Sequence, residues 1–186
     1  MSILNTAFEK LFPTESISIL IQDAFDRGFI KMLLSREEIF KAHPQKQFFA
    51  LFDFDDAYED WRSMRGETVV EEISKGLCKK LVDKNAHVFL LPIPDNQLKS
   101  QVWNEDNSLE KIKQKPHFCI EHIFWGQPGF ENYYEEQEHH GCKEIRFKVK
   151  KNNKVNFAKT VIPNVNADCF EVFRPMFEFI RSKCPS

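Results

Sequence analysis

Phe48 to Asp60 reads FFALFDFDDAYED, five apolar residues followed by four aspartates and a glutamate within eight positions. A short apolar run without polar interruption predicts a buried strand in a sheet. Side chains two residues apart on a strand point the same way, so Asp53 and Asp55 are expected to face one site beyond its carboxyl end. That end is where open parallel sheets place their ligands.

Two interpretations of this acidic stretch stay open. Two carboxylates held so close either share a proton or bind a cation that favours both charges. A hard cation such as Mg²⁺ or Mn²⁺ suits carboxylate oxygens, and Asp56 is a further candidate ligand. The structural alternative is that Asp55 or Asp56 caps a short helix over residues 57–62.

The first half of the chain alternates between the hydrophobic periods of helices and strands. Helices are expected over residues 3–12, 28–43 and 68–81, and strands over residues 16–25, 48–52 and 87–94. The third of these helices rests on a capping box from Thr68 to Glu71 and on an apolar face that ends at Leu81. The alternation predicts an α/β fold, a Rossmann-like and mostly parallel sheet flanked by helices.

The second half is less regular, and we expect an α+β extension there. Residues 133–141 are expected to form an acidic loop or frayed helix, and residues 143–162 two strands about an Asn152-Asn153 turn, or a hairpin that leads into a helix. A last helix is expected to begin near Asp168 and to bend at Pro175. Without repeats or a linker, residues 1–186 are predicted to form one domain, with residues 1–94 as its core and 95–186 packed on it.

The composition excludes several classes of protein. A hydrophobic fraction of 42% in 186 residues favours a globular chain over a disordered one. The net charge of -2 argues against a polyanion binder driven by bulk charge, so any contact with nucleic acid should be local. Five cysteines without a CxxC pair favour reduced thiols and a cytoplasmic protein. No apolar run approaches the roughly 20 residues that span a bilayer, so no membrane association is expected.

Three segments together carry a resemblance to a known family. They are LFDFDDAYEDW at residues 51–61, GETVVEEISKGLCKKL at 66–81 and VFLLPIP at 88–94. They resemble the D-x-D half of a Toprim domain, the catalytic fold of topoisomerases, bacterial primases and the OLD (overcoming lysogenization defect) nucleases. The resemblance implies a nuclease-type domain that cuts DNA or RNA phosphodiesters with Mg²⁺ or Mn²⁺, through a two-metal mechanism.

One part of the Toprim pattern is missing. Toprim domains pair the D-x-D with a glutamate at the end of an earlier strand, in a motif close to E-G-x-x-D that leads into a helix. ILNTAFEKLFP at residues 3–13 looks like that helix, but the strand and its glutamate are absent before it. We therefore expect weak or no activity from this chain unless Glu15 or Asp23 substitutes, or a partner chain completes the sheet.

The resemblance to OLD nucleases also implies a later glutamate and a lysine. Glu121 in CIEHIFW and Lys154 or Lys159 in KKNNKVNFAK are the matching positions, and we take Lys154 with Glu121, Asp53 and Asp55 as the catalytic candidates. The structural alternatives are a buried Glu121 satisfied by backbone or His122, and lysines that form a solubilising edge.

Two other functions fit parts of the sequence. A haloacid-dehalogenase-like phosphatase would use Asp53 as nucleophile and Asp55 as general acid, although it prefers Thr or Val where Ala57 stands. A non-catalytic interaction module of Toprim-like fold would use an unpaired edge beside the acidic strand to bind a partner or a second copy.

His139-His140 is a weak candidate for a transition-metal site, and Trp61, Trp103 and Trp125 are expected to serve packing rather than base stacking.

Overall fold

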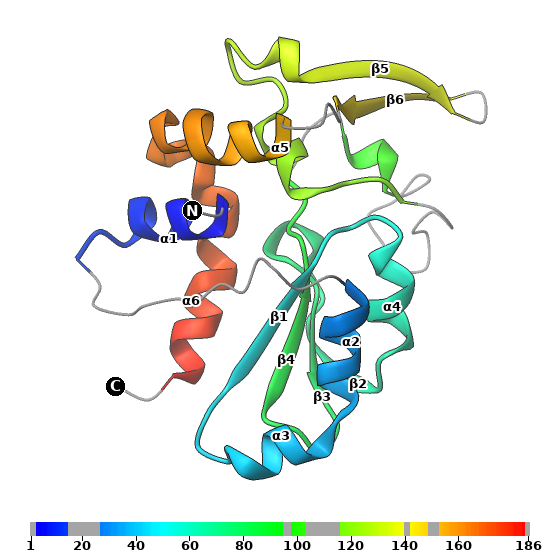
Figure 1. The fold of residues 1–186 in the computed structure, drawn as a ribbon, viewed down its shortest axis with the longest axis vertical. Coiled ribbons are helices and arrows are strands. Elements are labelled where there is room, and N and C mark those ends of the chain that lie inside the picture. The colour runs from blue at the N-terminus through cyan, green and yellow to red at the C-terminus, as the bar shows by residue number, and fades with distance from the viewer. Residues whose placement is uncertain are drawn as a thin grey trace. The chain divides into compact units, whose positions relative to one another are not determined.

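In the computed structural model, the chain divides into two compact units, each built from two separate segments (Figure 1). One unit contains residues 1–21 and 119–171, and the other, the sheet unit, contains residues 22–118 and 172–186. The structure describes residues 3–14, 27–94, 98–102, 116–139, 142–148 and 153–184. The strand expected over residues 16–25, Glu15, Asp23 and Trp103 lie outside these ranges.

The sheet unit holds a four-stranded mixed sheet in the order β1-β4-β3-β2. Its strands are β1 (Phe48–Phe52), β2 (Gly66–Val70), β3 (Cys78–Leu81) and β4 (Ala86–Leu90). β1 runs parallel to β4, with Phe49 opposite His87, whereas β3 is antiparallel to both β4 and β2. The fold is therefore mixed α/β with the predicted strands over 48–52 and 87–94, but the expectation of a mostly parallel sheet was wrong for the described strands.

The helix predicted over residues 68–81 is also wrong, because this segment forms β2, a short 3-10 turn (Ile73–Lys75) and β3. Its β-branched residues favour a strand, and Gly76 adopts a φ of 83°, which interrupts a helix. Gly66 allows close strand pairing, since a Cβ there would lie 2.6 Å from the Lys80 carbonyl oxygen. Tertiary pairing with β4 thus overrides the helical pattern of the capping box.

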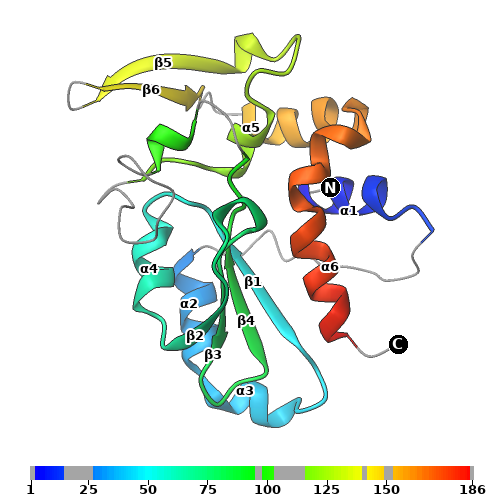
Figure 2. The same cartoon turned by 180° about the vertical axis from the view of Figure 1, so that it is seen from behind.

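Helices cover both faces of this sheet, as the two opposite views show (Figures 1 and 2). The helix expected over residues 28–43 is present as two shorter helices, α2 (Arg27–Ser35) and α3 (Glu37–Ala42), and the Phe40 ring of α3 lies edge-on to Phe48. On the same face, α4 (Ala57–Ser63) places the Trp61 indole N–H 3.0 Å from the Val88 carbonyl oxygen. On the other face, Phe179 of α6 (Arg174–Lys183) lies edge-on to Phe89.

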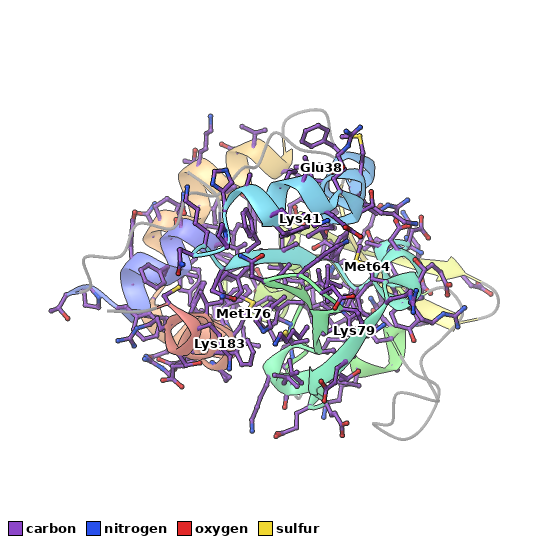
Figure 3. The ribbon with its side chains drawn as sticks, turned by 90° about the horizontal axis from the view of Figure 1, so that it is seen from below. Glu38, Lys41, Met64, Lys79, Met176 and Lys183 are labelled. Carbon is purple, nitrogen blue, oxygen red and sulfur yellow. The ribbon has the colours of Figure 1, made fainter. Side chains whose placement is uncertain are left out.

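Lys79 fixes the carboxyl end of α4 to the sheet. Its Nζ donates to the carbonyl oxygens of Trp61 and Arg62 at 3.2 and 3.1 Å and lies 4.1 Å from the centre of the Trp61 ring. Figure 3 shows Lys79 and Met64 from below the unit. Burial, with a smaller effect of Arg62, lowers the pKa of Lys79. A lysine that satisfies helix-terminal carbonyls stabilises the helix that follows the acidic stretch.

The other unit is built around a hairpin and several helical turns. α1 (Ile3–Leu11) confirms the first predicted helix. β5 (Tyr134–His139) pairs antiparallel with β6 (Cys142–Phe147), so the acidic loop or frayed helix expected at 133–141 is wrong. Two strands about Asn152-Asn153 are also wrong, because α5 (Asn153–Asn156) and a π-helical turn (Phe157–Val161) follow there. The alternative of a hairpin that leads into a helix agrees with β6 followed by α5. In the β5–β6 pairing Glu135 lies opposite Arg146 and Glu138 opposite Lys143, which offsets the repulsion among the β5 glutamates.

Aromatic rings form the core of this second unit. Phe157 lies edge-on to Phe124, Phe130 and Phe147, with ring centres 5.1 to 5.8 Å apart.

In the C-terminal segment, a 3-10 stretch (Ala167–Phe173) precedes α6, and Pro175 lies in the first turn of that helix. Proline is tolerated at that position because its missing N–H has no partner in the helix.

Candidate functional site

The acidic strand end follows β1 directly and is fixed by backbone hydrogen bonds. The Phe52 carbonyl accepts from the Leu91 N–H at 3.0 Å, and Phe54 exchanges two hydrogen bonds with Phe118, of 2.8 and 2.9 Å. The Phe54 side chain is fully buried and stacks on Tyr58. Asp53 and Asp55 flank this buried ring and are both half-buried, and the alternation of side chains about Phe54 places them on the side opposite the ring, with the chain bending at Asp55.

The structural interpretation of these aspartates is confirmed for Asp55. Its Oδ1 accepts a hydrogen bond of 2.8 Å from the Ala57 N–H at the start of α4. Asp56 is exposed and its side chain makes no capping hydrogen bond. One oxygen of Asp55 is therefore used by the helix, and its second oxygen can serve another ligand.

The rest of the acidic stretch is neutralised by neighbouring basic residues. Asp60 forms ion pairs of 3.0 Å with Arg27 and 2.7 Å with Lys31, both on α2. Glu59 pairs with Arg62 at 2.9 Å on α4 itself. Asp60 and Glu59 are therefore paired with basic residues of α2 and α4.

Glu121 and Lys154, in the other unit, form an ion pair. Glu121 lies on a 3-10 helix (Ile120–Phe124) and is only 5% exposed. Lys154 lies on α5, and its Nζ is 3.2 Å from Oε1 of Glu121. The alternative in which His122 satisfies Glu121 does not fit this geometry, because His122 uses both ring nitrogens elsewhere. The two residues that the sequence singled out for the second half of the site are thus brought together.

His122 is a fully buried residue that the sequence interpretation did not assign. Its Nδ1 accepts from the Cys119 N–H at 3.1 Å and lies 3.0 Å from the Cys119 thiol, while Nε2 lies 3.0 Å from the Ile145 carbonyl oxygen. This network assigns the proton to Nε2. The spacing of three residues is that of a capping box, the signal that could have identified the pair. Tyr134, whose pKa burial raises, donates to the Glu121 carbonyl at 2.6 Å.

Lowering the pH from 7.5 to 5.5 is expected to destabilise the protein through His122. Burial lowers the pKa of His122, so below about pH 6.5 the unfolded chain binds a proton that the folded ring resists. The free energy of unfolding should fall by up to about 1.4 kcal/mol per pH unit until the folded pKa is reached. Urea unfolding of the wild type and of His122→Asn at both pH values measures the difference.

The variant should show the weaker pH dependence, because only the contribution of His122 is removed; His87, whose pKa burial also lowers, stays in both chains. An NMR titration of the wild-type His122 ring provides a second measurement that does not depend on the variant folding. A His122 pKa at or above 6.5 would contradict the expectation.

The described residues do not form a metal centre by themselves. In the ranges that the structure describes, no three His, Cys, Asp or Glu side chains are grouped to hold an ion. Asp53 and Asp55 supply two carboxylates on one side of the chain, fewer than a hard divalent cation takes when it is bound by protein oxygens alone.

The side chains of His139 and His140 lie outside the part of the chain that the structure describes. Trp61 is buried and bonded to Val88, so its predicted packing role is confirmed.

Comparison of this chain with known proteins identified no relative. A search against family models, curated proteins and solved structures finds no match to this chain.

Among the described helices, none has the length and apolar character needed to cross a membrane. Cys78, Cys119, Cys169 and Cys184 carry free thiols. Burial raises the pKa of Cys78 to about 12, which makes that thiol unreactive at neutral pH.

Proposed function

We propose that this chain is a Toprim-like, nuclease-type domain that acts on DNA or RNA phosphodiesters, with Asp53 and Asp55 at the centre of its site. The observation that carries the proposal is the position of these carboxylates. Both follow the carboxyl end of β1, the strand that runs parallel to β4, and both face away from buried Phe54. Ligands of α/β sheets bind at such strand ends.

The pairing of Glu121 with Lys154 supports the same proposal. These are the two positions that match the later glutamate and lysine of OLD nucleases, and they are 33 residues apart in sequence. A buried glutamate held by a half-exposed lysine is also what a purely structural ion pair looks like, so it supports the proposal less strongly than the aspartates. Lys159, the alternative lysine, is exposed.

In this proposal the chain supplies only part of a Mg²⁺ or Mn²⁺ site. Asp53 and Asp55, with Asp56 beside them, are the candidate ligands, and the remaining acidic ligand comes from another segment or from a partner chain. Weak or absent hydrolysis by the chain alone is therefore expected. The free thiols support the proposal of a cytoplasmic protein, since reduced cysteines are typical there.

Hydrolysis of a model diester tests the proposal. The chain with Mn²⁺ is expected to cleave bis(p-nitrophenyl) phosphate slowly, and Asp53→Asn and Asp55→Asn are expected to reduce the rate by about ten-fold or more, as removal of a group that contacts the reacting atoms does. Glu67→Gln, which changes an exposed acid on β2, is the matched control and should retain the wild-type rate.

The monoester p-nitrophenyl phosphate separates the phosphatase alternative from the nuclease. Preference for the monoester, lost in Asp53→Asn, would favour a haloacid-dehalogenase-like phosphatase. Measurable hydrolysis of either ester at the same rate by the wild type and Asp53→Asn would count against both enzymes.

A second candidate function, a non-catalytic interaction module, is favoured by the position of β1. Within the described ranges, β1 has one strand neighbour, β4, and lies at the edge of the four-stranded sheet. An exposed edge pairs readily with a strand of a partner or of a second copy. Self-association seen by light scattering, unchanged in Asp53→Asn and without ester hydrolysis, would support this function over the first.

A further inference from the structure

A cavity lies in the sheet unit, at the end opposite the acidic residues. It has a volume of about 760 Å³ and is lined by residues that precede or begin β1 and β4, among them Gln47, Asn85 and His87. Asp53 lies beyond the other end of β1. The volume falls in the range of small-molecule sites, roughly 300 to 1,000 Å³. This cavity is therefore separate from the proposed catalytic site.

The charge of the cavity wall is strongly one-sided. Four lysines, Lys41, Lys80, Lys84 and Lys183, line it together with a single acid, Asp83. Figure 3 looks at this end of the unit and shows Lys41 on α3 and Lys183 on α6. A wall with this excess of ammonium groups attracts an anion.

Lys84 and Lys41 already have partners, which leaves Lys80 and Lys183 to bind a ligand. Lys84 donates to the Leu34 carbonyl at 2.5 Å, and Lys41 pairs with Glu37 at 2.7 Å. Lys80 and Lys183 instead lie near His87: Lys80 is opposite it in the β3–β4 pairing, and both charges lower its pKa after the larger effect of burial. Lys80 and Lys183 are thus the two lysines of the wall that lie beside His87.

The cavity also has apolar walls and a buried polar atom. Phe40, Val69 and Phe179 line it, and Val69 is 40% exposed. His87 is 4% exposed, stacks on Phe49, and within the described residues its Nδ1 has no hydrogen-bond partner. Apolar surface next to localised positive charge fits a ligand that combines a flat ring with an anionic group.

We infer that this cavity binds a terminal phosphate attached to a planar ring system, as in a nucleoside monophosphate. Lys80 and Lys183 pair with the phosphate oxygens, and the base lies against the apolar part of the wall that includes Phe40 and Val69. The inference does not depend on the proposed nuclease function, because it uses neither Asp53 nor Asp55. The same terminal phosphate could come from a free nucleotide or from the 5′ end of a nucleic-acid strand.

Calorimetric titration of the full chain at low salt tests this inference with four probes: AMP, adenosine, a trinucleotide with a 5′ phosphate, and the same trinucleotide without it. AMP is expected to bind at least ten-fold more tightly than adenosine. Lys80→Glu and Lys183→Glu are each expected to weaken AMP binding by about ten-fold or more, since each replaces a charge-assisted hydrogen bond by repulsion.

Lys75→Glu is the matched control, because Lys75 is an exposed lysine of the same unit outside the cavity. It should bind AMP as the wild type does. If only the phosphorylated trinucleotide binds, and Lys80→Glu abolishes this, the phosphate comes from a strand end. The inference is overturned if neither AMP nor the phosphorylated trinucleotide binds more tightly than its counterpart without the phosphate, or if Lys80→Glu and Lys75→Glu have equal effects. Circular dichroism of each variant checks that it is folded.

Discussion

Phe54→Ala is expected to destabilise the sheet unit by about 3 to 5 kcal/mol, the usual cost of deleting a buried phenyl ring. Phe54 is fully buried, stacks on Tyr58 at 5.5 Å between ring centres, and lies between the two candidate ligands. Removing the ring leaves a cavity next to the paired backbone of Phe54 and Phe118. Urea unfolding of the wild type and the variant, followed by Trp fluorescence, measures the difference in the free energy of unfolding.

Phe29→Ala is the matched control for this change. Phe29 lies on α2 of the same unit and is 36% exposed, so the same deletion removes less buried surface there. Its loss should stay below about 1.5 kcal/mol. Similar losses for the two variants would show that the segment after β1 is not packed as described, and the shared orientation of Asp53 and Asp55 would lose its structural basis.

Lys154→Met is expected to destabilise the other unit by about 2 kcal/mol, because it leaves the Glu121 carboxylate buried without this ion pair. The usual cost of breaking a buried pair is larger, about 3 to 5 kcal/mol, but the Lys154 side chain is 48% exposed and water can partly replace it. Adding Glu121→Gln should recover part of the loss, since a neutral amide is less costly to bury than an unpaired charge.

Lys159→Met is the control, because Lys159 is exposed and lies one turn away on the following π-helical segment. It should have little effect on unfolding by urea. A Lys154→Met variant as stable as Lys159→Met, or a double variant less stable than Lys154→Met alone, would contradict the proposed energetics of the Glu121–Lys154 pair.

Local sequence patterns predicted the elements that their own residues define. α1, the two helices that follow, β1 and β4 are encoded by apolar periodicity and by nearby prolines. The segment from Gly66 to Leu81 was mispredicted because capping-box chemistry is local, whereas its strands are formed by pairing with β4 and with each other. β5 was missed for a similar reason: its glutamates suggested a loop, and its partner β6 lies beyond it in sequence.

The candidate site was predictable to the extent that it follows one strand. The position of Asp53 and Asp55 after a buried strand is visible in the sequence, whereas the choice of Asp55 over Asp56 as the cap comes from the structure. The partner of Glu121 was named only through the family resemblance, because a contact across 33 residues leaves no local signal. The cavity with Lys80 and Lys183 was not predicted, since it depends on strands and a helix that are distant in sequence.

The most direct test of the central claim is a crystal of the chain soaked in manganese chloride and measured at the manganese absorption edge. We predict an anomalous peak within about 2.0 to 2.6 Å of carboxylate oxygens of both Asp53 and Asp55, the distances typical of hard divalent cations and oxygen. The peak should be absent from an Asp53→Asn crystal treated in the same way. No peak at these residues in the wild type, with ordered side chains, would contradict the assignment of the acidic strand end as a metal-dependent nuclease site.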